Sequence, residues 1–160
     1  MTQRMPGIES HDAAVSSFKG VPINRIDFID TGKLKYQHHG FPLDLAALNA
    51  EKVLGCVENN ETKFKLLNEL YENQDSWASG SDINSINQKI FKISNNYGLN
   101  NDKNKNCLND QNLEDEILNE RINASKKYSI EATPTIFINE KKYSGKHNYE
   151  GFKKEILKFL

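Results

Sequence analysis

The 160-residue chain contains no Cys-x-x-Cys motif, because its only two cysteines, Cys56 and Cys107, lie far apart. Two cysteines are too few for a disulfide-rich scaffold, and their spacing fits no zinc-binding pattern. No segment approaches the roughly 18 consecutive apolar residues of a membrane-spanning helix. The sequence therefore excludes a disulfide-knotted miniprotein, a zinc finger and a helical membrane span.

The chain also has almost no net charge, since its 21 Lys and Arg residues and 22 Asp and Glu residues give a formal charge of -1. The lysines are interspersed with acidic residues, which is typical of a solvated, mixed surface. Such a balance gives no electrostatic case for nucleic-acid binding. We expect no nucleic-acid partner, no metal ion and no cofactor.

The N-terminal stretch "MTQRMPGIESHD" (1–12) lacks the apolar core of a signal peptide. We therefore expect either a cytosolic chain or a chain that lacks its natural start. Residues 1–22 show no clear hydrophobic period, and Pro6, Gly7, Gly20 and Pro22 punctuate them.

Regular hydrophobic periods begin after residue 28 and alternate between the strand and helix types. Asp44 and Asp82 stand where helices would begin and are plausible N-caps. The patterns predict a strand over 34–38, helices over 41–57, 61–74, 81–98 and 113–130, a hairpin of strands 134–138 and 141–143, and a closing helix over 149–160. A short helix is also expected before Cys107. This order favours an α/β or α+β protein with a helical block inserted in a small sheet.

Four pieces of sequence occur in a fixed order: "FIDTGKLKY…GFPLDLAALNAEKVLGC", "LYENQDSWAS", "CLNDQ" and "ATPTIFINEKKYSG". Together they resemble the DsbA-like thiol:disulfide oxidoreductases, a thioredoxin-fold family of the bacterial periplasm. The resemblance runs from about Phe28 to the C-terminus. It implies an α/β, thioredoxin-like fold with an inserted α-helical subdomain, in a single domain over 1–160.

Within that domain the resemblance implies an atypical segment over 1–27, a helical insertion with a long return helix over about 44–128, and a last unit over 129–160. It also implies a cis peptide bond between Thr133 and Pro134, which turns the Thr133 backbone outward, where a peptide pairs with it like an added strand. Thr133 and Pro134 are therefore the expected substrate-binding residues. The expected partners are unfolded or cysteine-containing polypeptides of the periplasm.

Cys56 and Cys107 match family positions outside the active site, where many relatives have a structural pair. A bridge would enclose roughly fifty residues and could contribute about 4 kcal/mol by restricting the unfolded chain. The alternative is a pair of buried free thiols. A redox role for the two cysteines would require exposed thiols of low pKa.

The chemistry of the family needs a Cys-x-x-Cys at the N-terminus of the first helix, where a thiolate forms at neutral pH. Counting back from "FIDTG" places Ser10–Ala13 over that motif, and neither Ser10 nor Ala13 supports dithiol exchange. The strand before the motif would be residues 2–8, where Pro6 and Gly7 do not suit a central strand. We therefore expect a DsbA-like protein that does not catalyse thiol–disulfide exchange.

Other interpretations of this N-terminus stay open. The chain is then a non-catalytic peptide-binding or chaperone-like module, or a truncated or frame-shifted product without activity. Kappa-type glutathione transferases share the fold and place a serine where Ser10 falls, to hold the thiolate of glutathione. Ser10, His11 and Asp12 also contain the letters of a hydrolase triad, but adjacent residues cannot form its chain of hydrogen bonds.

His38 and His39 lie at a predicted strand end without a third metal ligand, so we expect them to be structural. Trp77 is expected to pack the helical insertion onto the sheet domain, with a hydrogen-bond partner for its indole N–H.

Overall fold

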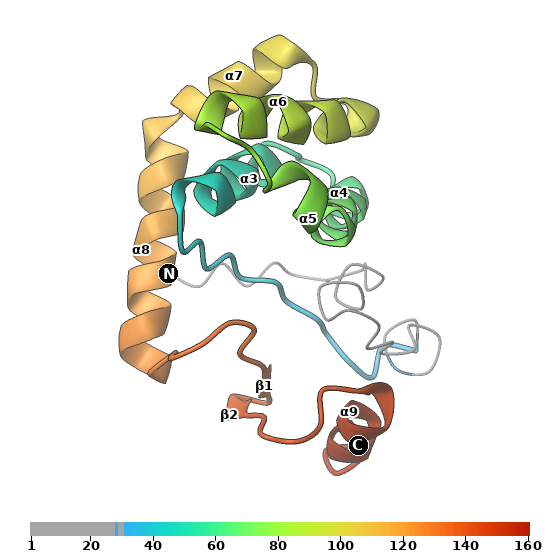
Figure 1. Cartoon of the computed structure of the whole chain (residues 1–160). Helices are drawn as coiled ribbons and strands as arrows, with labels where there is room; N and C mark the ends of the chain where they lie inside the picture. The colour runs from blue at the N-terminus through green and yellow to red at the C-terminus, as the bar shows by residue number, and fades with distance from the viewer. Residues whose placement is uncertain (1–27, 29–30) are drawn as a thin grey trace.

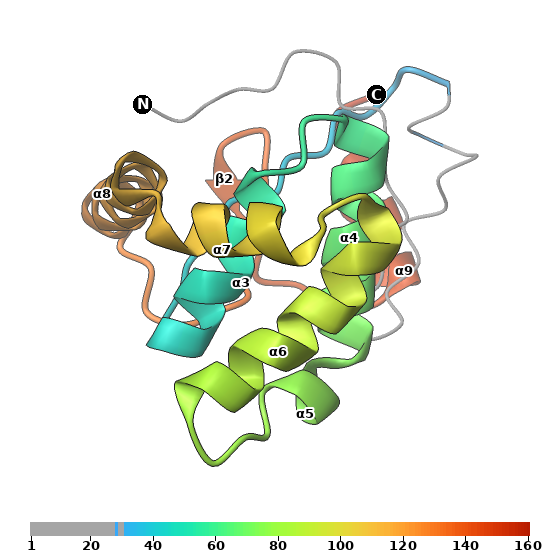
Figure 2. The same ribbon diagram turned by 90° about the horizontal axis from the view of Figure 1, so that it is seen from above.

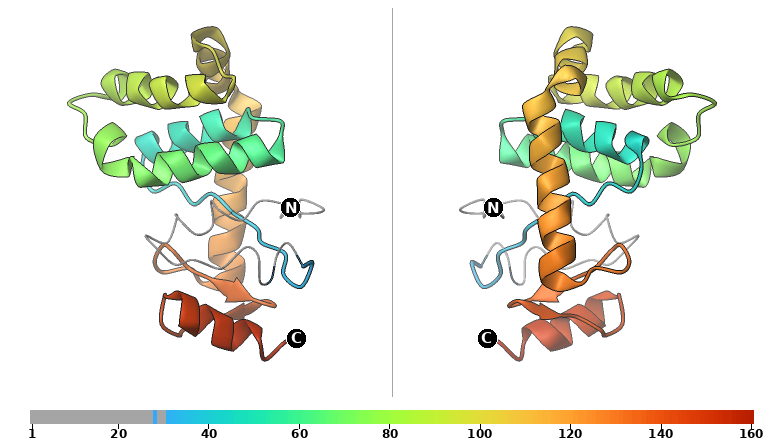
Figure 3. Two further views of the ribbon diagram at one scale, coloured as in Figure 1. Left: turned by 90° about the vertical axis from the view of Figure 1, so that its right-hand side faces the viewer. Right: turned by 90° about the vertical axis from the view of Figure 1, so that its left-hand side faces the viewer.

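The computed structural model describes Phe28 and residues 31–160, with helices and strands labelled as in Figure 1. A helical block lies at one end of the molecule, and a β-hairpin with the last helix lies at the other (Figure 1). Helix α8 (Gln111–Tyr128) runs along one side and connects the two ends, as the side views in Figure 3 show. No helix in the described part of the chain is long and apolar enough to cross a membrane.

The helical block is built from several short helices that begin at capping side chains. It consists of α3 (Leu45–Gly55), α4 (Asn60–Glu72), α5 (Gln74–Trp77), α6 (Ile83–Ser94), the 3-10 helix η1 (Asn95–Tyr97) and α7 (Asn101–Asn109). Asp44 and Asp82 accept hydrogen bonds from backbone N–H groups of α3 and α6, so both predicted N-caps are confirmed. Gly98, with φ of 87°, ends η1 in the left-handed region that favours glycine.

The core of this block lies between α3, α4 and α6, which pack around one another in the view of Figure 2. Val53, Leu66 and Ile90 have no exposed surface. Trp77 joins the same core, and its indole Nε1 donates a hydrogen bond to the carbonyl oxygen of Leu70 at 2.6 Å. Trp77 therefore packs within the block and not, as was expected, onto the sheet domain, whereas the expected hydrogen-bond partner of its indole N–H is present. The residues "QDSW" also form α5, where the sequence indicated a break.

The opposite end, which we call the base, holds the hairpin of β1 (Phe137–Ile138) and β2 (Lys141–Lys142) and the helix α9 (Tyr149–Ile156). The strands are antiparallel and pair Phe137 with Lys142. Asn139 (φ 46°) and Glu140 (φ 65°) form the turn, and two positive φ values in a two-residue loop are typical of a type I′ hairpin. A second, smaller core lies here, formed by Phe28, Tyr143, Phe152 and Ile156.

The segment 34–40 connects the two ends, and it is not the strand that the sequence predicts over 34–38. Among the described residues the ladder contains only β1 and β2. Exposure still alternates, because Leu34, Tyr36 and His38 are half-buried whereas Lys35 and Gln37 are exposed. A sequence pattern detects this period of two, but a strand also needs a hydrogen-bonded neighbour. The neighbour expected here, residues 2–8, lies outside the described residues, and the described chain is mainly helical.

Candidate functional site

The loop 129–136 joins the end of α8 to β1 and contains the Thr133–Pro134 peptide bond, which is cis in the structure. Ser129 caps α8 in the left-handed conformation, with φ of 48°. The Thr135 hydroxyl donates a hydrogen bond to the carbonyl oxygen of Ala132, which closes the loop on itself. Thr133 and Pro134 are both exposed. The predicted cis bond is therefore present, at the surface between α8 and the hairpin.

An aromatic pair fastens the two ends of this loop together. The rings of Tyr128, the last residue of α8, and Phe137, the first of β1, lie 4.7 Å apart between centroids. The Lys127 ammonium group lies 4.8 Å from the centroid of the Tyr128 ring, within the range of a cation–π contact. Since this pair brings the end of α8 against the start of the hairpin, the loop that holds Thr133 and Pro134 has both of its ends fixed.

Cys56 and Cys107 form a disulfide bond, with their Cα atoms 6.2 Å apart. Cys56 caps the C-terminus of α3 and is half-buried, whereas Cys107 lies in α7 and is buried. The bond ties the first helix of the block to the last one before α8. The predicted pairing is confirmed, and the alternative of two free thiols is not what the structure contains.

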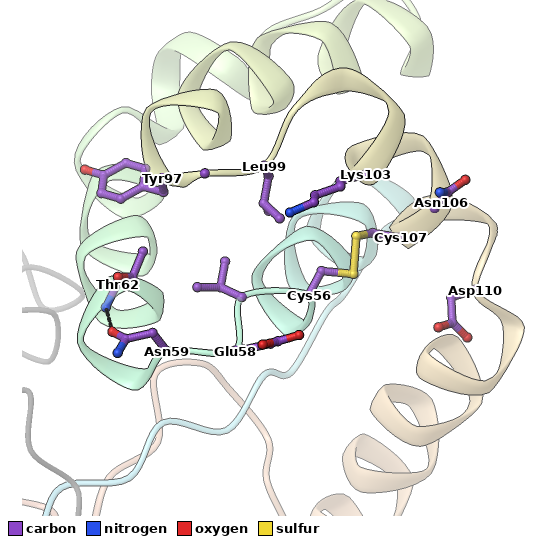
Figure 4. Close-up of a pocket in the computed structure, with 12 residues that line it drawn as sticks. Cys56, Glu58, Asn59, Thr62, Tyr97, Leu99, Lys103, Asn106, Cys107 and Asp110 are labelled. Carbon is purple, nitrogen blue, oxygen red and sulfur yellow. Dashed lines mark hydrogen bonds between the residues drawn. A yellow bond between two sulfur atoms is a disulfide. The ribbon is translucent and has the colours of Figure 1, made fainter.

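The disulfide faces a hollow of about 470 Å³ in the helical block (Figure 4). Its other walls come from the start of α4, from η1 and the residues after it, and from α7. The side chains around it include Glu58, Asn59, Thr62, Tyr97, Lys103 and Asp110. The hollow is thus lined by acidic, basic and amide side chains together, so its charge favours no single class of ligand.

A partly buried group of ionisable side chains surrounds Glu51 of α3. His38 Nε2 lies 3.4 Å from Glu51 Oε1. Burial, and secondarily the negative charge of Glu51, raise the pKa of the Tyr71 hydroxyl to about 12. Burial lowers the pKa of Lys63, although Glu51 and Glu116 oppose that shift. His38 is thus a partner of Glu51, and nowhere in residues 31–160 do three potential metal-ligating side chains gather.

A lysine that the sequence analysis did not single out is buried in the block. The Lys52 side chain is 2% exposed, and its Nζ lies 2.6 Å from Glu114 Oε2 and 2.7 Å from the Leu108 carbonyl oxygen. Lys52 follows Leu48 by four residues and so lies on the same face of α3. A lysine on the apolar face of a helix is the sequence signal that could have identified it.

Of the residues predicted from the family motif, Thr133 and Pro134 lie together in the exposed loop at the base, while Cys56 and Cys107 lie in the helical block. The structure does not bring these two pairs into one site (Figure 1). Ser10 and Ala13, the predicted positions of the missing Cys-x-x-Cys, lie outside the described residues.

Comparisons with known proteins agree with the fold. A family model described as Thioredoxin matches residues 24–158. The crystal structure of α-DsbA1 from Wolbachia pipientis is similar, with 28% identity, a TM-score of 0.76, and coverage of 92% of this chain and 78% of that chain. A protein-disulfide isomerase from Novosphingobium aromaticivorans has 17% identity and a TM-score of 0.70, with coverage of 84% of this chain and 79% of that chain.

At 17% identity the second likeness concerns the fold alone. The comparison with curated proteins gives no match. The thioredoxin family model, in contrast, spans most of the chain, from before Phe28 to the last helix. The chain therefore belongs to the DsbA-like thiol:disulfide oxidoreductases of the thioredoxin family.

Proposed function

We propose that this protein binds unfolded or cysteine-containing polypeptides in the periplasm without exchanging disulfides with them. One observation carries the proposal. The chain has two cysteines, and both are joined in the Cys56–Cys107 bond of the helical block. No thiol is left for the reactive pair that the family places at the start of its first helix, and dithiol exchange needs such a pair.

The binding part of the proposal rests on family membership and on the loop 129–136. Thr133 and Pro134 are exposed, and the loop leads directly into β1. An extended peptide gains main-chain hydrogen bonds when it lies along an exposed edge of this kind, and side chains on either side of the edge then select its sequence. Binding of this kind needs no cysteine, so it survives the absence of a catalytic pair.

A disulfide-exchange assay tests the non-catalytic part. We expect the protein to leave the rate of insulin reduction by dithiothreitol unchanged from the rate with the reagent alone. A clear acceleration would overturn the proposal. A double Cys56→Ser/Cys107→Ser variant separates the sources of such an acceleration, because it removes both cysteines of the chain.

A binding assay tests the other part. A fluorescently labelled polypeptide that has been reduced and alkylated should bind saturably, and Thr133→Ala or Pro134→Ala should weaken that binding. Thr62→Ala is the matched control, since Thr62 lies on α4 in the helical block. Absence of saturable binding would leave the protein without the proposed activity.

A second candidate function is disulfide exchange at Cys56–Cys107, and the hollow beside this bond favours it. An external thiolate would attack Sγ of the half-buried Cys56, form a mixed disulfide and release Cys107 as a thiolate. A second thiol of the same reductant would then complete the reduction. Acceleration in the insulin assay that disappears in the Cys56→Ser/Cys107→Ser variant would favour this candidate, and no acceleration would exclude it.

A further inference from the structure

Charge is distributed unevenly between the two ends of the molecule, although the whole chain is nearly neutral. Residues 44–120 carry fourteen Asp and Glu residues against seven Lys, a formal charge of -7. Residues 126–160 carry eight Lys against four Glu, a formal charge of +4. The first range includes the helical block and the upper part of α8, and the second includes the loop with Thr133, the hairpin and α9 (Figure 1). The expected substrate-binding residues therefore lie in the basic part.

Two pairs of neighbouring lysines flank the loop that holds Thr133 and Pro134. Lys126 and Lys127 lie in the last turn of α8, and Lys141–Lys142 form the whole of β2. All four side chains are exposed. Glu131 and Glu140 are the acidic residues of this stretch, so residues 126–142 keep a formal charge of +2.

These charges lie close enough to act on a peptide at the loop. Lys142 is paired with Phe137, which follows Pro134 by three residues. Even a fully extended chain, at about 3.3 Å for each residue, would place Phe137 no more than roughly 10 Å from Pro134. The Debye length at physiological ionic strength is about 8 Å, and a bound peptide of several residues extends further along the edge than that. Side chains of such a peptide thus come within the unscreened range of the lysines.

On the basis of the proposed polypeptide-binding function, we propose that the Thr133–Pro134 edge prefers polypeptide segments that carry Asp or Glu side chains. An acidic side chain near Lys141 or Lys142 forms an exposed ion pair, and such a pair raises affinity by about 1.5- to 5-fold. The net positive charge of the base also attracts an acidic segment during approach, because the fields of its lysines add together.

Three peptides that differ only at two positions test this preference. Each is a labelled heptapeptide with a central serine, and the two residues next to that serine are both Asp, both Asn or both Lys. By fluorescence anisotropy at low salt we expect the Asp peptide to bind most tightly and the Lys peptide most weakly. The differences should shrink as salt is raised, because the charges are exposed.

Charge-reversed variants of the full chain test whether the lysines of β2 cause this preference. Lys141→Glu/Lys142→Glu should lower the affinity for the Asp peptide by about 2- to 30-fold and raise the affinity for the Lys peptide. Lys92→Glu/Lys105→Glu is the matched control. It changes the net charge by the same amount at exposed positions of α6 and α7, far from the base, and should leave the order of affinities unchanged. Circular dichroism verifies that each variant is folded.

The outcomes separate this inference from the function on which it rests. Equal affinities for the three peptides, each weakened by Pro134→Ala, would overturn the charge preference and leave the binding function intact. An identical response of both charge-reversed variants would overturn the placement of the preference at β2. Absence of binding for all three peptides, and for the long alkylated polypeptide, would overturn the binding function itself.

Discussion

The helical block and the base differ in how their described residues are held together. The block has a continuous apolar core, a disulfide bond and a buried lysine with two oxygen partners. The base has a core of four buried residues and two strands of two residues each. The block is thus built for rigidity, and the base for an accessible edge.

The two ends therefore have separate roles: one stabilises the fold, and the other presents an exposed loop. Both cysteines of the chain serve the rigid end, while the exposed Thr133–Pro134 loop lies at the other. A thioredoxin-fold protein of this composition is expected to keep its fold and its surface without a reactive dithiol. The following predictions test how far the two ends differ, beginning with the largest expected effect.

Removal of the disulfide should destabilise the block most. Cys56 and Cys107 are 51 positions apart, and a closed loop of that length corresponds to about 4 kcal/mol in the chain-entropy model. Cys56→Ser/Cys107→Ser should lower the free energy of urea unfolding by about this amount. Dithiothreitol should then lower the stability of the wild-type protein but not of the variant. A variant as stable as the wild type would show that the bond contributes nothing to the block.

The two ends should also respond differently when an ion pair loses its acidic member. Among the described residues, Glu114→Ala leaves the buried Lys52 cation with the Leu108 carbonyl oxygen as its remaining partner, at an expected cost of about 1–3 kcal/mol. Glu155→Ala in the base removes the partner of the exposed Lys158, and should cost under about 0.5 kcal/mol.

Lys52→Met is the control for this comparison. It removes the buried charge and keeps a similar volume, so it should cost less than Glu114→Ala. Urea denaturation of all three variants measures the differences. Equal losses for Glu114→Ala and Glu155→Ala would contradict the contrast between the ends.

Alkaline pH should weaken the block through Tyr71. Its pKa is about 12 in the folded protein and about 10 in an unfolded chain, so the folded state binds more protons between these values. Stability is therefore unaffected below pH 10 by this group and falls as pH rises from 10 to 12, by roughly 1–2 kcal/mol. Chemical denaturation at pH 9 and pH 11.5 measures the fall. Tyr71→Phe should reduce it, and an equal fall in that variant would assign it to other groups.

The smallest effect is expected in the turn of the hairpin. Glu140 has a φ of 65°, a conformation that costs a residue with a β-carbon about 1 kcal/mol and costs glycine far less. Glu140→Gly should therefore stabilise the base by up to about 1 kcal/mol. Asn139→Gly, at φ of 46°, should gain less, because asparagine tolerates this region. Thermal unfolding of both variants checks the order.

Local features of the fold could be predicted from the sequence. Asp44 and Asp82 begin helices as expected, and the hydrophobic periods that follow them do form α3 and α6. The pairing of Cys56 with Cys107 and the cis bond before Pro134 came with the family resemblance, and both are present. The caps depend on a few neighbouring residues, and the other two features depend on a family motif. Both kinds of information are present in a single sequence.

Features that depend on distant packing could not be predicted. Lys52 lies on the apolar face of α3, which signals burial, but no period within α3 shows that α7 and α8 return to supply its oxygen partners. The same holds for the group around Glu51, whose partners His38 and Tyr71 come from separate segments. The segment 34–38 also depends on distant packing. Its alternating pattern correctly predicts which side chains are exposed, but the segment does not form the strand that this pattern indicated.

Tyr36 packs against both apolar clusters, the one in the helical block and the one in the base. Because one side chain contributes to both cores, neither core can open fully without loosening the other. The two ends should therefore behave as a single cooperative unit in native-state hydrogen exchange, despite their different construction. We therefore expect a ligand on the exposed loop to change the exchange rates of the distant helices, with the Tyr36 ring as the contact shared by the two ends.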